Sequence, residues 1–334
     1  MKILITGGAG FIGSNFVYYT LEKHPDWDVV CIDSLTYAAK LETLDSALEN
    51  PKFEFIKGDI TDRTFIFKTF NEEGFQVVIN FAAESHVDKS IEDSTVFLKT
   101  NILGTQILMD ACKEYNVHRY HQVSTDEVYG DLPIDRPDLM FTEESPIQPS
   151  SPYAASKAAA DLLVQAYYRT YGLPVTLSRC SNNYGPYQFL EKLIPSMVVK
   201  ALQGDKICIY GDGSHVRDWL HVSDHCSALD LIIKEGKPGE VYNIGGNTEK
   251  NNLEVVGRIL DVMGKKRDLI EFVEDRPGHD LRYAIDAGKM KKSFGWEPVV
   301  RFDKGIVTTI EWYIENKTWW DEKLGVTAWS NCLE

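Results

Sequence analysis

Thr125, Asp126 and Glu127 are three adjacent polar residues that follow RYHQVS, a segment with the composition of a buried strand. A polar turn at the end of a sheet is the ordinary explanation of such a triplet. A hydroxyl and two neighbouring carboxyl groups also suit acid–base catalysis, because repulsion and burial push the pKa values of adjacent acids apart. One carboxyl group can then be ionised while its neighbour is protonated, as the roles of base and acid require.

Tyr153 and Lys157 form a second candidate pair in the segment SPYAASKAAADLL. Their spacing of one helical turn places both side chains on the same helix face. A phenol with its ordinary pKa of about 10 is a poor base at neutral pH. We expect the ammonium group of Lys157, together with a positive nicotinamide ring, to lower the pKa of Tyr153 so that it can accept a proton from an alcohol. The ordinary alternative is a Tyr/Lys pair on a solvated helix face.

A glycine pattern in ILITGGAGFIGSNFV indicates a site for a dinucleotide. Gly7, Gly10 and Gly13 follow an expected strand and begin an expected helix, where they permit a tight turn, close approach of a pyrophosphate and close helix–strand packing. Asp33 ends the next strand, where a carboxylate can accept hydrogen bonds from ribose hydroxyls. No arginine follows Asp33 immediately, so NAD is favoured over NADP. Asp59 ends the third expected strand, where it could contact adenine.

Helices and strands that hold these groups alternate along the first half of the chain. Strands too apolar to have a solvated face, with helices between them, indicate a parallel sheet covered on both faces. We therefore expect an α/β fold with a Rossmann-like doubly wound sheet, in which residues 1–173 form an NAD-binding domain that carries Tyr153 and Lys157 on its last helix. The expected helices include 12–23 and about 94–115, and the expected strands are KILI, DVVCID, FEFIKGD, QVVINFAA and RYHQVST.

After Pro174 this alternation loosens. PVTLSRC and KICIYG still predict strands, but SNNYGPYQFLEKLIP and EDRPGHDLRYAID are long loops that mix charged and aromatic residues. Long loops in a compact fold are usually functional or disordered, and the aromatic and apolar content of these two argues against disorder. We expect residues 174–334 to form mainly a smaller substrate-binding region, interleaved with the last strands of the sheet. The Trp-rich end of the chain carries no motif that indicates a role.

Composition limits the classes of partner. The chain has 334 residues, 43% of them hydrophobic, with a formal net charge of -15 and a pI near 5.0. This negative charge disfavours non-specific binding to nucleic acid or an anionic membrane, so an anionic ligand needs a local basic patch. No segment reaches the roughly 20 apolar residues of a membrane span, and MKILITGG shows no signal-peptide pattern, so we expect a cytoplasmic protein.

The cysteines give no sign of a metal site or a disulfide framework. They lie in apolar or helical stretches, without a CxxC pair or a His/Cys cluster of ligand spacing. We therefore predict reduced, mostly buried thiols and no bound metal. The six residues are Cys31, Cys112, Cys180, Cys208, Cys226 and Cys332.

These motifs together resemble the extended short-chain dehydrogenase/reductase family, with TGxxGxxG near the start and YxxxK after a strand that ends in Ser/Thr. The resemblance runs over nearly the whole chain. Within that family, STDEVYG, SNNYGPYQFLEKLIP, YGDGSHVRDWLHV and DRPGHDLRYAID are similar to the motifs of the dTDP-glucose 4,6-dehydratases. Gln188 and Leu190 depart from the residues usual in that loop, which affects the expected loop geometry and not the chemistry.

The resemblance implies a lyase of deoxysugar biosynthesis that converts dTDP-glucose to dTDP-4-keto-6-deoxyglucose. NAD oxidises C4, water is eliminated across C5 and C6, and the hydride returns to C6. In this hypothesis Tyr153, supported by Lys157, takes the proton of the C4 hydroxyl, and Thr125 hydrogen-bonds the C4 oxygen. Glu127 removes the C5 proton and Asp126 protonates the departing C6 hydroxyl. The division of roles between Asp126 and Glu127 comes from the family and not from their spacing.

Ligand contacts are implied by the same resemblance. Besides Tyr153 and Lys157, the cofactor-binding residues are Gly7, Gly10, Phe11, Ile12, Gly13, Asp33, Ser34, Thr36, Asp59, Ile60, Phe81, Ala82, Ala83, Ser85, Thr100 and Asn183. The substrate-binding residues are Ser85, His86, Thr125, Asn182, Lys192, Leu193, Tyr210, Arg217, Asn252, Arg276 and His279. Lys192, Arg217 and Arg276 would clamp the pyrophosphate, since guanidinium groups suit bidentate phosphate contacts.

Assembly and two rival functions complete the expectations. The helices around 101–115 and 152–171 are apolar enough to bury a second face, and the resemblance implies that they pair into the four-helix interface of a homodimer. A nucleotide-sugar 4-epimerase would need only Tyr153, Lys157 and a rotating keto sugar. A non-catalytic NAD-sensing module would have no use for these side chains. The sequence leaves thymine and uracil open as the base, because they differ by one methyl group.

Overall fold

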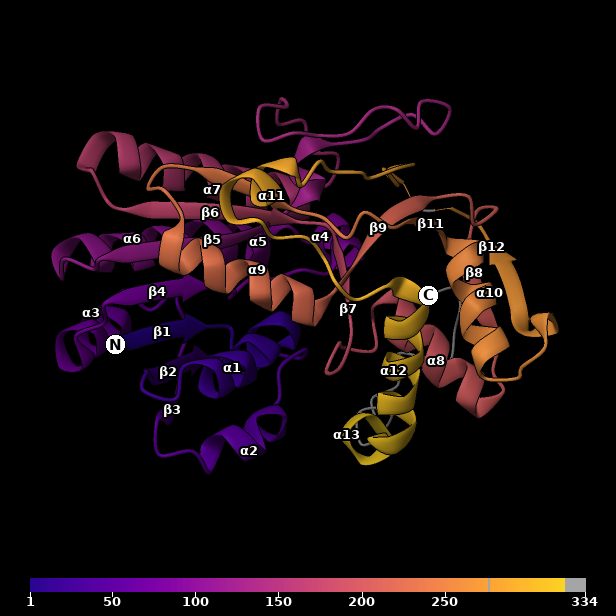
Figure 1. Ribbon diagram of the computed structural model, residues 1–334, viewed down its shortest axis with the longest axis horizontal. Coiled ribbons are helices and arrows are strands. Elements are labelled where there is room, and N and C mark those ends of the chain that lie inside the picture. The colour runs from indigo at the N-terminus through magenta and orange to yellow at the C-terminus, as the bar shows by residue number, and fades with distance from the viewer. Residues whose placement is uncertain (276, 322–334) are drawn as a thin grey trace.

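A computed structural model describes residues 1–275 and 277–321. Arg276 and the end of the Trp-rich segment, including Cys332, lie outside the described residues. The chain builds a large sheet with helices on both faces and, beside it, a smaller region of short strands and helices (Figure 1).

Seven parallel strands form the large sheet, which confirms the predicted α/β doubly wound fold. Alternate residues of each strand point to opposite faces. Ile3 and Ile5 therefore belong to one buried cluster and Leu4 to the other. In spatial order the strands are β10 (Val241–Ile244), β6 (Val175–Cys180), β5 (Arg119–Thr125), β4 (Val77–Asn80), β1 (Lys2–Thr6), β2 (Asp28–Asp33) and β3 (Phe53–Lys57).

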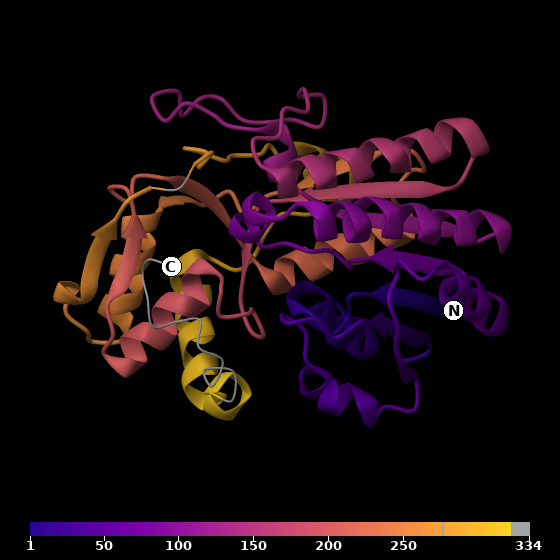
Figure 2. The ribbon, with the colours of Figure 1, turned by 180° about the vertical axis from the view of Figure 1, so that it is seen from behind.

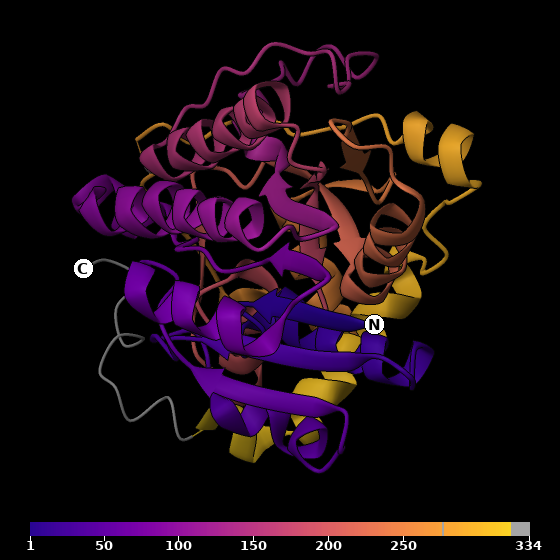
Figure 3. The same ribbon diagram turned by 90° about the vertical axis from the view of Figure 1, so that its left-hand side faces the viewer.

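Helices cover both faces of this sheet, as Figure 3 shows from the end. The first face is covered by α1 (Phe11–Lys23), α9 (Val222–Glu235) and α11 (Gly288–Phe294). The second face is covered by α3 (Arg63–Glu73), α6 (Thr105–Glu114) and α7 (Pro152–Tyr171). In Figure 2, α6 and α7 lie side by side. The apolar faces of the strands are thus shielded from water on both sides.

The sequence sets the two ends of α7. The side chain of Ser151 accepts a hydrogen bond from the backbone N–H of Ala154 at 3.1 Å, and Pro152 follows in the first turn, where its missing N–H costs nothing. Gly172 ends the helix with a φ of 68°, a conformation that glycine adopts readily. These ends place Tyr153 in the first turn and Lys157 one turn later.

A separate hydrophobic core holds the smaller region together. In Figure 1, the helices of this region lie beyond the carboxyl ends of the large sheet's strands. The strands β6 and β10 also come from the second half of the chain, so the two regions are interleaved as expected. The elements of the smaller region are β7 (Asn182–Tyr184), α8 (Leu193–Gln203), β8 (Ile207–Tyr210), β9 (Val216–His221), β11 (Glu249–Asn251), α10 (Asn252–Val262), η4 (Arg267–Leu269), β12 (Ile270–Val273), α12 (Phe302–Glu315) and α13 (Lys317–Asp321).

Short segments connect these elements. The helix expected over about 94–115 is present as three consecutive segments, the middle one a π-helix. Within the described residues, no helix has the length and hydropathy needed to cross a membrane. Cys31, Cys112, Cys180 and Cys226 are buried and free, as predicted, whereas Cys208 is disulfide-bonded, so the prediction of a reduced thiol is wrong for it. The connecting segments are η1 (Leu41–Leu44), α2 (Asp45–Leu48), α4 (Val87–Glu92), α5 (Thr95–Phe97), η2 (Leu98–Gly104) and η3 (Asp126–Tyr129).

Candidate active site

Two adjoining cavities open at the carboxyl ends of the sheet strands, where ligands bind in open α/β sheets. The smaller one, of about 380 Å³, lies against the loops that follow β1 to β5. The larger one, of about 1150 Å³, extends between these loops and the smaller region. Both cavities are lined by Ala39, Glu127, Asn182, Phe189, Glu191 and Lys192.

The turn between β1 and α1 can be made only by glycine at its key positions. Gly7 has a φ of +70°, and a Cβ atom there would lie 2.6 Å from the backbone nitrogen of Ala82. A Cβ atom on Gly13 would lie 2.3 Å from the carbonyl oxygen of Gly7. The carboxylate of Asp33 fastens the turn by accepting a hydrogen bond from the backbone N–H of Ala9 at 2.9 Å. Side chains at these glycines would close the space at the start of α1.

The smaller cavity fits a dinucleotide. Gly10 precedes α1 as its N-cap residue, and no side-chain hydrogen bond caps this end of the helix among the described residues. The positive end of the helix dipole is therefore available to a pyrophosphate. Asp33 is buried, which raises its pKa, while hydrogen bonds from the backbone of Leu35 and Ala9 act in the opposite direction. All the residues predicted to bind the cofactor line this cavity, from Gly7 to Asn183. Their individual contacts to NAD remain predictions.

Asp126 is buried at the end of β5, where η3 begins. The side chain of Thr125 caps η3 by accepting a hydrogen bond from the backbone N–H of Glu127 at 3.3 Å. Asp126 is only 2% exposed, and its Oδ1 accepts a hydrogen bond from the Thr125 hydroxyl at 3.4 Å. Its Oδ2 is buried without a hydrogen-bond partner in residues 1–275 and 277–321, and the residue Asp126 lines the smaller cavity. A buried oxygen of this kind is suited to a ligand group.

Burial is the main reason that the pKa of Asp126 lies well above its ordinary value. The negative charges of Glu127 and Asp218 raise it further, and Arg217 lowers it by a smaller amount. This shift favours the uncharged form of Asp126, from which a proton can be donated. Glu127 lines both cavities, so the two neighbouring carboxyl groups lie at the junction of the dinucleotide pocket and the larger cavity.

Tyr153 is a buried phenol close to both candidate acids. Burial raises its pKa well above the ordinary value, and the charges of Glu127 and Asp126 act in the same direction. Only a hydrogen bond with Thr125 lowers it. Lys157 donates its hydrogen bond to the backbone oxygen of Val123 at 2.7 Å. In the chain alone, desolvation and two nearby acids therefore favour the protonated phenol, while the predicted lowering of the Tyr153 pKa beside a bound nicotinamide ring stays a prediction.

A buried polar network lies under Lys157. Arg179 on β6 pairs with Asp161, one turn beyond Lys157 on α7, with 2.9 Å between Nε and Oδ2. Arg179 also donates to the hydroxyl of Tyr129 at 2.9 Å. Burial lowers the pKa of Lys157, and the charge of Asp161 opposes this shift. The sequence analysis missed this network, although the spacing of Lys157 and Asp161 on one helix face was a signal for it.

In the larger cavity, the predicted substrate-binding residues come from different elements. His86, Leu193, Tyr210, Arg217, Asn252 and His279 line it, Asn182 and Lys192 line both cavities, and Ser85 and Thr125 line the smaller one. Within the described part of the chain, the side-chain oxygens of Asn182 and Asn252 are buried without hydrogen-bond partners. Arg276 lies outside the described residues. The structure thus brings the other predicted residues together, while their roles remain predictions.

The two predicted phosphate-binding cations that the structure describes contact backbone oxygens. Arg217 donates to the carbonyl of Asp280 at 2.9 Å and lies 4.3 Å from the ring centre of Tyr283. Lys192 donates to the carbonyl of Ser85 at 2.7 Å. These contacts hold both cations beside the larger cavity. Tyr283 was missed by the sequence analysis, because nothing local relates it to Arg217.

His215, Asp275 and His279 form a group with the composition of a metal site. The distance from Asp275 to Nδ1 of His279 is 2.7 Å, and to Nε2 of His215 it is 3.1 Å. The two imidazole rings are stacked, with their centres 3.7 Å apart. A carboxylate shared by two imidazoles accounts for this arrangement. The absence of a metal therefore stays a prediction.

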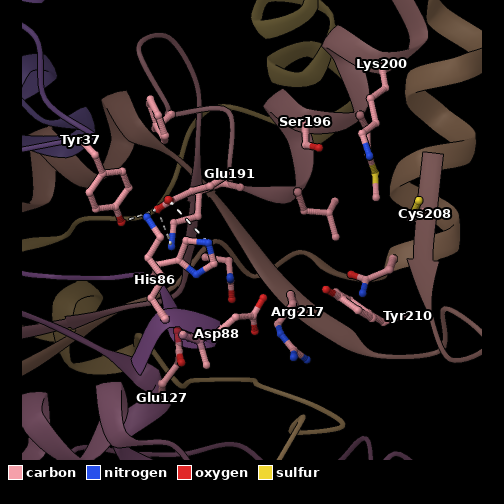
Figure 4. A pocket seen from close by; sticks show the side chains of 18 of the residues that line it. Tyr37, His86, Asp88, Glu127, Glu191, Ser196, Lys200, Cys208, Tyr210 and Arg217 are labelled. Atoms are coloured by element: carbon pink, nitrogen blue, oxygen red, sulfur yellow. Dashed lines mark hydrogen bonds and ion pairs between the residues drawn. The ribbon is translucent and has the colours of Figure 1, made fainter. Parts of the chain in front are cut away.

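Glu191 and Tyr37 are further residues that the sequence analysis did not select. Figure 4 shows their side chains at the wall of the larger cavity, beside His86. Glu191 also lines the smaller cavity. The one local signal for Glu191 was its position next to Lys192, and Tyr37 had no signal beyond its place after Asp33.

Comparison with known proteins adds independent evidence. The family described as GDP-mannose 4,6 dehydratase matches residues 4–309. A dTDP-glucose 4,6-dehydratase of Neisseria meningitidis serogroup B is 48% identical over 97% of this chain and 96% of its own. The crystal structure of the dTDP-glucose 4,6-dehydratase from Bacillus anthracis str. Ames in complex with NAD is 50% identical, with a TM-score of 0.90 over 97% of this chain and 99% of that one. A UDP-glucose 4-epimerase from Thermus thermophilus in complex with NAD is 30% identical, with a TM-score of 0.87 over 95% of this chain and 100% of that one.

Proposed function

The chain belongs to the dTDP-glucose 4,6-dehydratase family, within the extended short-chain dehydrogenases/reductases, and on this premise we propose that it converts dTDP-glucose to dTDP-4-keto-6-deoxyglucose with NAD as cofactor. It is a hydro-lyase, because water leaves the sugar and no net oxidation occurs. The epimerase alternative is disfavoured by the much lower identity of the epimerase in the comparison.

One observation carries this function: the buried carboxyl group of Asp126, whose Oδ2 has no hydrogen-bond partner among the described residues, lies next to Glu127 at the junction of the two cavities. Elimination of water from a hexose needs a base for the C5 proton and an acid for the departing C6 hydroxyl. Epimerisation at C4 needs neither group. The orphaned Oδ2 of Asp126 is the atom from which we derive the acid role.

We assign the steps to side chains as follows. NAD, when bound, supplies the acceptor and then the donor of the hydride that leaves C4 and arrives at C6. Tyr153 takes the proton of the C4 hydroxyl, while Thr125 hydrogen-bonds the C4 oxygen. The C5 hydrogen is then α to a carbonyl and acidic, so Glu127 removes it, and Asp126 protonates the C6 hydroxyl, which leaves as water.

Protons balance over this cycle. Glu127 returns a proton to C5, so it ends as it began. Tyr153 gains one proton from the C4 hydroxyl, and Asp126 loses one to water. Exchange of one proton through solvent restores both groups. Lys157 adds positive charge near Tyr153 and favours its ionised form.

The experiment that tests the function is incubation of the protein with dTDP-glucose labelled with deuterium at C4. We expect a 4-keto sugar, detected by its absorbance in alkali, with the deuterium at C6 by mass spectrometry. UDP-glucose in a parallel reaction tests the base preference. Formation of dTDP-galactose without a keto product would establish the epimerase instead. Unchanged dTDP-glucose would favour the non-catalytic NAD-sensing module.

We also propose the homodimer expected from the sequence, formed through a four-helix interface. In its support, large apolar side chains are exposed on η2 and α7, which pack against each other: Leu98 is 48%, Leu103 46% and Leu162 56% exposed. A charged residue at Leu162 should shift the sedimenting species to monomer. We also propose a cytoplasmic location and a division of the chain into two regions between residues 173 and 174. The separate hydrophobic core of the smaller region supports this division.

A further inference from the structure

Residues 186–192, which we name the strap, connect β7 to α8 and cross from the smaller region to the dinucleotide-binding half. The first end of the strap is fixed by Pro186, whose carbonyl accepts a hydrogen bond from Asn15 on α1 at 3.0 Å. Tyr187 then packs between Tyr18, at 5.9 Å between ring centres, and Trp312, at 4.8 Å. This end of the strap is therefore held by packing against both halves.

The second end of the strap is held by polar contacts. Lys192 donates to the carbonyl of Ser85 at 2.7 Å. The hydroxyl of Tyr37 donates to Oε1 of Glu191 at 3.3 Å, and Nε2 of His86 lies 3.8 Å from the other oxygen of that carboxylate. Figure 4 shows the three side chains converging, Tyr37 and His86 from the first half of the chain and Glu191 from the strap. These contacts close the strap against the loops that follow β2 and β4.

A carboxylate is an unusual group at this position. The side chain of Glu191 is 8% exposed and lies between a pocket for a dinucleotide and a cavity for a nucleotide sugar, both of which take phosphates. Its charge would repel those ligands unless it were engaged. Partial burial, with the charge of Glu191 as the next cause, raises the pKa of Tyr37, so its hydroxyl remains a donor. Burial lowers the pKa of His86, so the neutral imidazole adds little charge.

We propose that Glu191 is a positioning residue that keeps the strap closed over the dinucleotide pocket, so that bound NAD leaves only when the Tyr37–Glu191 contact opens. The proposal rests on the proposed function, because it places NAD in the smaller cavity. Four strap residues, Gln188, Phe189, Glu191 and Lys192, line that cavity. A cofactor that is regenerated in every turnover has no need to leave, and a closed strap would retain it.

The first test measures exchange of bound NAD in the full-length protein. The protein is loaded with radiolabelled NAD, chased with unlabelled NAD, and filtered at intervals. We expect Glu191→Ala to accelerate the loss of label about tenfold, because it removes one hydrogen bond to a charged acceptor. That factor corresponds to about 1.4 kcal/mol. Glu191→Gln keeps an oxygen that can accept from Tyr37, so its acceleration should be smaller.

Tyr37→Phe removes the Tyr37–Glu191 hydrogen bond from the other side and should also accelerate exchange, by no more than Glu191→Ala, because the Glu191 carboxylate still lies 3.8 Å from His86 and from Lys192. The double variant Tyr37→Phe/Glu191→Ala should be no faster than Glu191→Ala alone, because the two residues act through one contact. Glu42→Gln is the matched control. Glu42 is an exposed carboxylate at the wall of the larger cavity, which Tyr37 and Glu191 also line, and it takes no part in the contacts described above. Its exchange rate should equal that of the unsubstituted protein.

Two further readouts separate positioning from general stability. The melting temperature of the NAD-bound protein should stay within a few degrees of the original, while exchange accelerates. In Glu191→Ala, the kcat at saturating NAD should change by a smaller factor than the concentration of NAD that full activity requires. If Glu191→Ala does not fold, Tyr37→Phe decides the question.

Exchange at the original rate in a folded Glu191→Ala or Tyr37→Phe variant would overturn the proposal and leave the dehydratase assignment intact. Additive acceleration in the double variant would also overturn it, because the contact would then not be shared. A chain that binds no NAD at all and forms no keto sugar would refute the proposed function first.

Discussion

Replacing Asp126 by asparagine separates its role as an acid from its role in the fold. Burial, with the neighbouring charges of Glu127 and Asp218, raises the pKa of its carboxyl group well above the ordinary value and so favours the protonated form. An uncharged carboxamide of nearly the same shape should therefore be accepted without loss of NAD binding. General acid catalysis contributes about 10²- to 10⁴-fold to a rate. We expect kcat for dTDP-glucose to fall by that factor, which is about 2.7 to 5.4 kcal/mol of barrier.

Rapid mixing with dTDP-glucose is the assay that locates the lost step. C4 oxidation precedes proton donation to C6, so reduced nicotinamide should form at nearly the original rate in Asp126→Asn and then persist. Solvent deuterium should still enter C5, because Glu127 is unchanged. Asp135→Asn, which alters an exposed carboxylate, serves as the control. Turnover at the original rate, or a stall before nicotinamide reduction, would refute the acid role of Asp126.

The same variant has a consequence for stability that depends on pH. The folded-state pKa of Asp126 is raised above the unfolded value of about 3.9, so the native state binds this proton more tightly. The resulting stabilisation is complete below the unfolded pKa and is lost as pH rises toward the folded pKa. Asp126→Asn does not carry this loss. Its free energy of unfolding should therefore improve relative to the original chain as pH rises above about 4, and a constant difference in urea denaturation across that range would contradict the raised pKa.

Three other changes test separate parts of the site. Glu127→Gln should still show transient reduced nicotinamide but no exchange of the C5 proton with solvent, and normal exchange would disprove its role as base. Gly13→Ala should abolish retention of NAD during purification, because the new Cβ would lie 2.3 Å from the oxygen of Gly7. Asp161→Asn should lower the free energy of unfolding by about 3–5 kcal/mol, because it leaves Arg179 buried without its charged partner. An unchanged urea midpoint would mean that Arg179 is solvated by other groups.

Local patterns were sufficient to predict six of the seven strands of the large sheet, whereas β10 was not predicted. The strands β1 to β6 are apolar runs that can be recognised alone, and α7 has its cap, its first-turn proline and its terminal glycine in the sequence. Among the short strands of the smaller region, β8 lies within the predicted strand KICIYG, but β11 has no such signal. Residues Glu249–Asn251 form β11 only because they pair antiparallel with β9. Their sequence, EKN, has no strand propensity that could have indicated this pairing.

The candidate site divides in the same way. Gly7, Gly13 and Asp33 could be selected because their spacing is set by one βαβ unit. Glu191 and Asp218 act on residues that are far away in the sequence, so no local pattern relates them to the site. Asp218 lies on β9 and accepts hydrogen bonds from the backbone of Gly246 and Thr248, yet its charge contributes to the protonation of Asp126. Only the tertiary arrangement reveals that contribution.

Burial favours the proposed acid role of Asp126 and opposes the proposed base role of Tyr153. In the chain alone, burial favours the uncharged forms of Tyr153 and Asp126, and the charge of Glu127 reinforces both shifts. The acid role of Asp126 is thus built into the fold, whereas the base role of Tyr153 is not. Positive charge beside Tyr153 favours its ionised form, and Lys157 supplies such a charge although its ammonium group donates to the backbone oxygen of Val123. The positive ring of NAD would add a second charge, so we expect the ionised form of Tyr153 to be more populated in the NAD-bound protein than in the chain alone.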